Sequence, residues 1–112
     1  MNSQTSTPPR ARVGEILRTL ALPVHRRGYG YLCIAIPRFA LDSAQSVTKE
    51  LYPYIAESCG CSDWRSVESA IRDVIQVAWE RRNPGVWEEY FPNQVKCPGS
   101  KQFIATLAER IK

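Results

Sequence analysis

The sequence predicts an all-α fold: a compact domain of six helices that contains a helix-turn-helix. Apolar residues recur at the three- and four-residue spacing of a helix along most of the chain, and no segment makes a convincing strand. The clearest such segment is Ser62–Trp79, which separates apolar from polar side chains onto two faces. Gly60 lies just before it and can adopt the left-handed conformation that ends a helix. A helix, a short glycine turn and a second helix together are typical of a helix-turn-helix.

Length and charge set the limits of the prediction. With 112 residues, 44% of them hydrophobic, the chain is long enough for one domain with a real core and too short for two. A net charge of +4 and a pI near 9.0 suit a polyanionic partner, although many soluble proteins share them. No apolar run approaches the roughly 18 residues that span a bilayer, and the N-terminus lacks the pattern of a secretory signal. We therefore expect no membrane association and a cytoplasmic protein, which is associated with the nucleoid if its polyanionic partner is DNA.

The N-terminal third is predicted to hold an arm and two helices. Residues 1–12 are polar and proline-containing, which favours a disordered arm that touches phosphates, and the folded domain is expected over residues 13–112. Apolar spacing from Val13 predicts a short first helix that Pro23 stops. A basic turn follows, and the almost wholly apolar Tyr29–Leu41 is predicted to be a central helix, kinked at Pro37.

The remaining four helices follow from spacing and end signals. Val47–Ala56 is expected to form the first helix of the motif, started or bent by Pro53, and the recognition helix is expected over about Asp63 to Arg81. Val86–Phe91 is predicted to be a short helix that ends before a proline. Ser100 is a suitable cap for a last helix that reaches the C-terminus.

The four cysteines show no framework spacing and are interpreted as free thiols. The alternative is that Cys59-x-Cys61 forms half of a metal site. One intervening residue is tighter than the usual two to four, however, and no second Cys or His pair completes four ligands. We expect neither a metal nor a cofactor. A single histidine, His25, and scattered cysteines also give no motif for catalysis, so an enzyme is the least favoured class and no catalytic residue is predicted.

The chemistry of the predicted recognition helix suits double-stranded DNA. The first residues of such a helix meet base edges. Glu68 can accept from a cytosine amino group, and Arg72 or Arg65 can pair with guanine. From the spacing alone, the favoured interpretation is instead that Glu68 and Arg72, four residues apart, form an ion pair on a solvated face. The base-reading candidates are Trp64, Arg65, Ser66, Glu68, Ser69 and Arg72.

Affinity would come from cations that neutralise phosphates and from backbone N–H groups at helix N-termini. The phosphate-binding candidates are Arg26, Arg27, Lys49, Lys96 and Lys101. A homodimer on paired half-sites is a further expectation, with the last helix or the Trp87-Tyr90-Phe91 segment as an exposed patch, although most of these aromatic residues are better placed in the core.

The order of several motifs resembles the C-terminal effector domain of stage-zero sporulation protein A. The resemblance covers about Val13 to Lys112. It implies a six-helix DNA-binding module of a response regulator, whose helix-turn-helix reads a short box upstream of sporulation genes, and it places Glu68 and Arg72 in the recognition helix. The motifs are Leu22-Pro23-Val24-His25-Arg26-Arg27-Gly28-Tyr29 with Tyr31-Leu32, Thr48-Lys49 with Leu51-Tyr52-Pro53 and Ile55-Ala56, Val67-Glu68 with Ala70-Ile71-Arg72, Val77-Ala78-Trp79, and Phe103-Ile104-Ala105.

The chain departs from that family in two respects. Ser66 and Ser69 stand where the family typically has arginines, and Asp73 stands in place of a histidine, so two cations are lost and one anion is gained. We expect weaker binding or a different target, with Arg65 compensating from one position earlier. The family's effector domain usually follows a receiver domain, for which this sequence has no room, and the starting Met1 favours a stand-alone relative over a fragment. The leading interpretation is a sequence-specific DNA-binding transcriptional regulator, and the alternative is a protein interaction module of the same fold.

Overall fold

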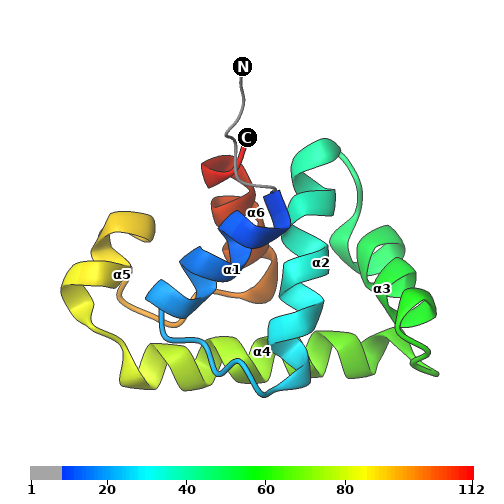
Figure 1. Ribbon diagram of the computed structural model, residues 1–112, viewed down its shortest axis with the longest axis horizontal. Helices are drawn as coiled ribbons and strands as arrows, with labels where there is room; N and C mark the ends of the chain where they lie inside the picture. Colours follow the sequence, from blue (N-terminus) through cyan, green and yellow to red (C-terminus); the bar gives the residue numbers. More distant parts are fainter. Residues whose placement is uncertain (1–8) are drawn as a thin grey trace.

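Six α-helices and one short π-helical turn make up the part of the protein that the computed structural model describes, residues 9–112 (Figure 1). Within this range no strand is present, so the predicted all-helical class and the number of helices are confirmed. The elements are α1 (Pro9–Thr19), α2 (Arg27–Leu41), η1 (Val47–Leu51), α3 (Tyr52–Ser58), α4 (Trp64–Arg81), α5 (Pro84–Tyr90) and α6 (Ser100–Arg110).

Helix α2 is the central element. It packs against α1, α3, α4 and α6, and α4 runs beneath it along one edge of the molecule (Figure 1). Leu32, Ala35 and Ile36 are completely buried, which agrees with the predicted central helix. The helix continues past Pro37 to its end at Leu41, and the kink expected at this proline stays a prediction.

Helix α1 differs from its prediction at both ends. It begins at Pro9 rather than Val13, so residues 9–12 are helical, while the rest of the expected arm lies outside the described residues. The earlier start has a tertiary reason, because the Arg12 guanidinium donates to the Arg110 carbonyl at the end of α6 (3.0 Å). The helix ends at Thr19, before Pro23, and Ala21 adopts a positive φ of 67° just beyond it.

The first helix of the motif, predicted over Val47–Ala56, consists of two consecutive segments, η1 and α3. Pro53 has no amide hydrogen, so it fits the first turn of α3, where that hydrogen would have no partner within the α-helix. Within η1 the chain widens to a five-residue hydrogen bond from Leu51 N–H to Ser46 O (3.0 Å). The Ser46 side chain caps this turn by accepting from Lys49 N–H (3.0 Å). Pro53 therefore starts the α-helix rather than bending it.

Trp87 of α5 and Phe91, the C-cap of this helix, complete the core. Trp87 and Phe91 are 2% and 3% exposed, and their rings pack against each other and against Phe103 of α6. The Trp87 indole N–H also donates to the Leu20 carbonyl (3.1 Å). Trp87 and Phe91 therefore do not form the exposed dimer patch considered above, and the core alternative holds for both.

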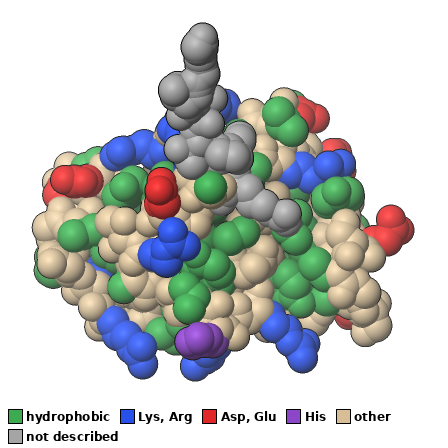
Figure 2. Space-filling view, in the orientation of Figure 1, with side chains coloured by type: hydrophobic (Ala, Val, Ile, Leu, Met, Phe, Trp, Pro, Cys, Tyr) green, Lys and Arg blue, Asp and Glu red, His purple; other side chains and the backbone are tan. Residues whose placement is uncertain are grey.

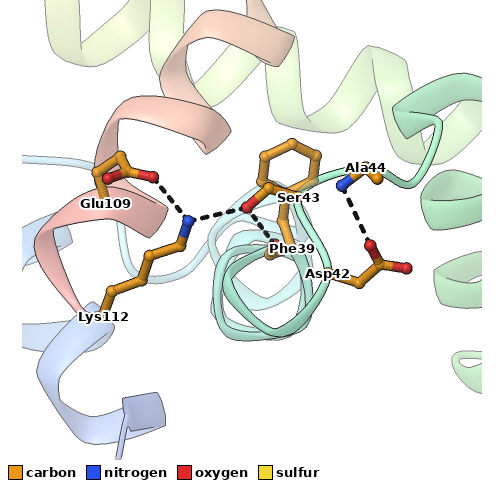
Figure 3. A network of polar contacts seen from close by, with 6 residues as sticks. All are labelled: Phe39, Asp42, Ser43, Ala44, Glu109 and Lys112. Carbon is orange, nitrogen blue, oxygen red and sulfur yellow. Dashed lines mark hydrogen bonds and ion pairs between the residues drawn. The ribbon is translucent and has the colours of Figure 1, made fainter.

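A polar network joins the C-terminus to the far end of α2, at the corner of the molecule away from α4 (Figures 1 and 3). The Lys112 ammonium pairs with Glu109 (2.7 Å) and donates to the Ser43 hydroxyl (3.0 Å). Ser43 in turn donates to the Phe39 carbonyl (3.3 Å). The charged side chains at this corner are thus engaged in holding two helix ends together.

Candidate nucleic-acid interface

The turn between α3 and α4 has the geometry that the sequence predicts for a helix-turn-helix. Gly60 has a φ of 72°, and Cys61 N–H donates to Ala56 O (2.8 Å) while Gly60 N–H reaches Glu57 O (3.4 Å). This pair of bonds is a Schellman motif, in which a left-handed residue satisfies the last carbonyls of a helix. The turn therefore ends α3 and redirects the chain into α4 within five residues.

Asp63 fixes the beginning of α4. Its carboxylate accepts from Arg65 N–H (2.9 Å), and its carbonyl accepts from the Ser66 hydroxyl (2.7 Å). The first of these bonds satisfies a backbone N–H that the first turn of a helix leaves without a partner. The helix runs from Trp64 to Arg81, which agrees with the predicted span to within one residue at its start.

One face of α4 is packed against the rest of the domain. Its buried residues are Val67, Ile71, Val74, Ile75 and Ala78, at helical spacing.

The start of α2 approaches this helix very closely. A Cβ added to Gly28 would lie 2.2 Å from the Ala70 carbonyl oxygen, so only a glycine fits here. The basic turn that precedes Gly28 is therefore held against the flank of α4.

The opposite face of α4 is exposed to solvent, and no other segment of residues 9–112 covers it. Its side chains surround an open hollow of about 520 Å³ near the middle of the helix. The exposed residues of this face include Arg65, Ser66, Ser69, Arg72, Asp73, Gln76 and Glu80. Helical spacing could have added Gln76 to the predicted site, since it follows Arg72 by one turn.

The structure brings most of the base-reading candidates onto this face, with two exceptions. Arg65, Ser66, Ser69 and Arg72 are exposed, and the Arg65 side chain is 73% accessible. Glu68 is half-buried at the edge.

Trp64 lies on the packed side of the helix, where its ring stacks on Tyr52 with 6.4 Å between centroids. Trp64 is therefore a packing residue and not a base reader, because its position in the first turn of α4 directs its ring toward α3.

Tyr52 marks the point where α3, α4 and α6 meet. Burial raises the pKa of its phenol, and the carboxylate of Glu68 acts in the same direction, while Ser100 and Arg72 partly offset this. The Ser100 side chain is thus a neighbour of Tyr52 at the start of α6, where Gly99, and not the expected Ser100, is the N-cap.

The phosphate-binding candidates divide into two groups. Arg26 and Arg27 lie beside α4: Arg26 pairs with Asp73, and Arg27 lines a hollow with Ser66 and the α3–α4 turn. Lys and Arg side chains gather along the edge of the molecule that α4 follows (Figure 2). The other candidates are exposed on other elements: Lys49 in η1, Lys96 before α6 and Lys101 in the first turn of α6.

Two of the cations on this surface already have acidic partners. Arg26 approaches Asp73 at 2.6 Å, and Arg65 approaches Asp63 at 3.5 Å. The one other ion pair among residues 9–112 is that of Lys112 at the far corner, so Glu68 and Arg72 do not form the helical ion pair considered as an alternative. Arg72 is thus a surface cation without an acidic partner within the described chain.

The cysteines and the histidine form no further site. The Cys61 sulfur lies 3.1 Å from the Tyr31 hydroxyl, which raises the pKa of Tyr31, and no disulfide is present. Residues 9–112 contain no group of three or more His, Cys, Asp and Glu side chains able to hold a metal ion. His25 is exposed in the basic turn.

These features define an all-helical helix-turn-helix domain whose second helix has one free face and a basic turn beside it. Residues 13–111 match the family described as the sporulation initiation factor Spo0A C-terminal domain. The chain belongs to this family, which is a family of DNA-binding effector domains of a sporulation regulator and not a family of enzymes. None of the helices in the described chain is long and apolar enough to cross a bilayer.

Proposed function

We propose that this protein is a sequence-specific transcriptional regulator that places α4 in the major groove of double-stranded DNA. The observation that carries the proposal is the free face of α4. Its side chains are exposed along the helix, and two arginines, Arg65 and Arg72, lie on the half that begins at the turn. A helix of about 10–12 Å diameter fits a major groove of about 12 Å width.

Base reading is assigned to the N-terminal half of α4. Arg72 and Arg65 are long enough to pair with guanine O6 and N7, and Glu68 at the edge can accept from a cytosine amino group. Ser66 and Ser69 supply shorter hydroxyl groups that can contact bases or phosphates. Each good bidentate contact discriminates against a wrong base by about 1–3 kcal/mol.

Phosphate binding is assigned to the two flanks of the same helix. The turn with Arg26 and Arg27 lies on one flank, where no side chain caps the N-terminus of α2. We assign the start of α6, with Lys101, to the other flank, because its N-terminus also lacks a side-chain cap. Helix N-termini attract anions because their N–H groups are unsatisfied and the helix dipole is positive there.

The test begins by selecting bound sequences from a random duplex pool. The double variant Arg65→Ala, Arg72→Ala is then measured on the selected site and on a random duplex. We expect a loss of about thirtyfold or more on the selected site, since two contacts of about 1–3 kcal/mol each are removed. The melting temperature should not change, because both side chains are exposed on a helix that alanine favours.

Lys112→Ala is the matched control, since it removes a positive charge from the far corner. It should leave binding within about twofold of the unmodified protein, because an exposed charge beyond a Debye length is screened. A double variant that protects the selected site as the unmodified protein does would refute the assignment of α4.

A protein interaction module of the same fold is the second candidate, and the ion pairs of Arg26 and Arg65 favour it. Each pair neutralises a cation that DNA binding would use. A salt titration against random duplex separates the two functions. A regulator should lose affinity steeply as salt rises, with a slope of about −0.9 for each phosphate contact, whereas an interaction module should show almost no binding at any salt concentration.

A homodimer on paired half-sites, acting at the nucleoid, completes the proposal. Paired sites are common for helix-turn-helix proteins, and their centres lie about one helical turn apart. The selected sequences test this directly: a dimer should select two copies of one half-site at a fixed spacing, and a monomer should select one.

A further inference from the structure

The ion pair between Arg26 and Asp73 connects the basic turn to the middle of α4. Arg26 Nη1 lies 2.6 Å from Asp73 Oδ2, although the two residues are 47 positions apart in the chain. Both side chains are more than half exposed, at 54% and 56%. The pair therefore lies on the surface assigned to DNA and not in the core.

The close approach of two helices fixes this pair in place. Gly28 meets the backbone of α4 at Ala70, which leaves Arg26 two residues before the point of contact and Asp73 three residues after it. The two side chains are thus attached to backbone segments that cannot separate without opening the α2–α4 packing. The Asp73 carboxylate stays within reach of this guanidinium whenever the domain is folded.

The pair adds little to stability, because exposed ion pairs are screened and lose side-chain entropy. Its main effect is on the charge that the surface offers to a phosphate. A guanidinium binds a carboxylate and a phosphate through the same N–H groups, so the two anions compete for it. The carboxylate also repels a phosphate that approaches the same flank of α4.

We propose that Asp73 limits the affinity of this surface for the DNA backbone by competing with phosphate for Arg26. The inference rests on the proposed function and specifies how its site is regulated. Weaker backbone binding makes the choice of site depend more on the contacts of Arg65 and Arg72 with bases, because backbone contacts carry no sequence information. Asp73 is accordingly a residue that raises selectivity at the cost of affinity.

The variant that tests this is Asp73→Asn, which keeps the size of the side chain and removes its charge. Binding to random duplex at low salt should tighten about fivefold, and the slope of log affinity against log salt should steepen by about 0.9, as expected for one more phosphate contact. The ratio of selected-site to random-duplex affinity should fall. Adding Arg26→Ala to Asp73→Asn should remove most of the gain, because the released guanidinium is its main source.

Two controls isolate the effect. Glu109→Gln breaks the other close ion pair at the far corner and should change neither affinity nor slope. Glu80→Gln removes a negative charge from the exposed face of α4. The Glu80 carboxylate accepts a hydrogen bond from the Gln76 amide (2.9 Å) and is not paired with a cation. Glu80→Gln should increase the affinity for random duplex by less than Asp73→Asn does, and adding Arg26→Ala should not remove this increase.

The outcomes separate this inference from the proposed function. If the unmodified protein binds duplex and Asp73→Asn binds equally or more weakly, the inference is wrong, and a loss of affinity would mean that Asp73 orients Arg26 instead. If Asp73→Asn alone binds random duplex, the inference is supported. If neither protein binds any duplex at low salt, the proposed function fails and this inference fails with it.

Discussion

The two faces of α4 are built under opposite constraints. On the packed face, Ile71 is completely buried and the Ala70 backbone lies against Gly28 with no space for another atom. On the free face, within about half a turn of Ile71, Ser69 and Arg72 are exposed. Because the packed face is close-packed, each carbon added or removed there changes the free energy of unfolding. Charged residues on the free face can be substituted with little effect on stability. A single helix can therefore keep its position while what it recognises changes.

The largest expected difference between the faces comes from two truncations. Ile71→Ala should reduce the free energy of unfolding by about 3 kcal/mol, because it removes buried carbons and leaves a cavity. Ser69→Ala, half a turn away, should change it by no more than about 0.5 kcal/mol. Urea denaturation of the two variants measures both values. Equal losses would contradict the division of α4 into a packed face and a free face.

A single added carbon tests the close approach of α2. Gly28→Ala should destabilise the domain by about 2 kcal/mol, since the new Cβ would overlap the Ala70 carbonyl and force the helices apart. Gly30→Ala is the matched control in the same helix. Nothing lies within 4 Å of its added Cβ, so it should stabilise the domain by about 0.5–1 kcal/mol through helix propensity alone. Thermal unfolding followed by circular dichroism compares the two, and a stable Gly28→Ala would show that the interface can adjust.

The cap of α4 is expected to have an intermediate effect. Asp63→Ala should cost about 1 kcal/mol, because Arg65 N–H loses its acceptor. The same change releases the Arg65 guanidinium from its acidic neighbour. We therefore expect lower stability together with tighter binding to random duplex, measured by urea denaturation and by a salt titration. Lower stability with unchanged binding would show that the 3.5 Å pair does not restrain Arg65.

The smallest expected effect compares two helix ends that share one hydrogen-bond pattern. The end of α1 has the same Schellman pattern as the α3–α4 turn. Leu22 N–H donates to Leu17 O and Ala21 N–H donates to Arg18 O, both at 2.9 Å. The residue in the left-handed position is here an alanine, Ala21. Ala21→Gly should stabilise by about 0.5 kcal/mol, because relief of the strain exceeds the entropy that glycine adds to the unfolded chain. Gly60→Ala should have the opposite sign. Open space surrounds Gly60, so only its backbone conformation contributes.

The accuracy of the sequence-based prediction follows the range of the interactions involved. The start of α4 was predicted well because Asp63 and Gly60 act on backbone groups only a few residues away. The start of α1 was wrong by four residues, since the bond that extends it joins Arg12 to Arg110. Trp64 was placed among the base readers because its ring partner, Tyr52, could not be known from spacing.

The predicted site was incomplete for a similar reason. The helical period places Arg65, Ser69 and Arg72 on one face, and the structure confirms that this face is free. The period also allows Glu68 to pair with Arg72, which it does not do. Nothing local indicates that Asp73 meets Arg26, because that contact requires the crossing of α2 over α4.

The sequence alone determined that the chain is helical, where α4 begins and ends, and which of its faces is polar. The spacing of apolar residues, the helix caps and a left-handed glycine determine these features, and each acts over only a few neighbouring residues because backbone hydrogen bonds in helices are local. The tertiary structure alone decided which charges on the free face remain available. That outcome depends on the distance between two helices, and a glycine far from α4 in the chain sets this distance by having no side chain.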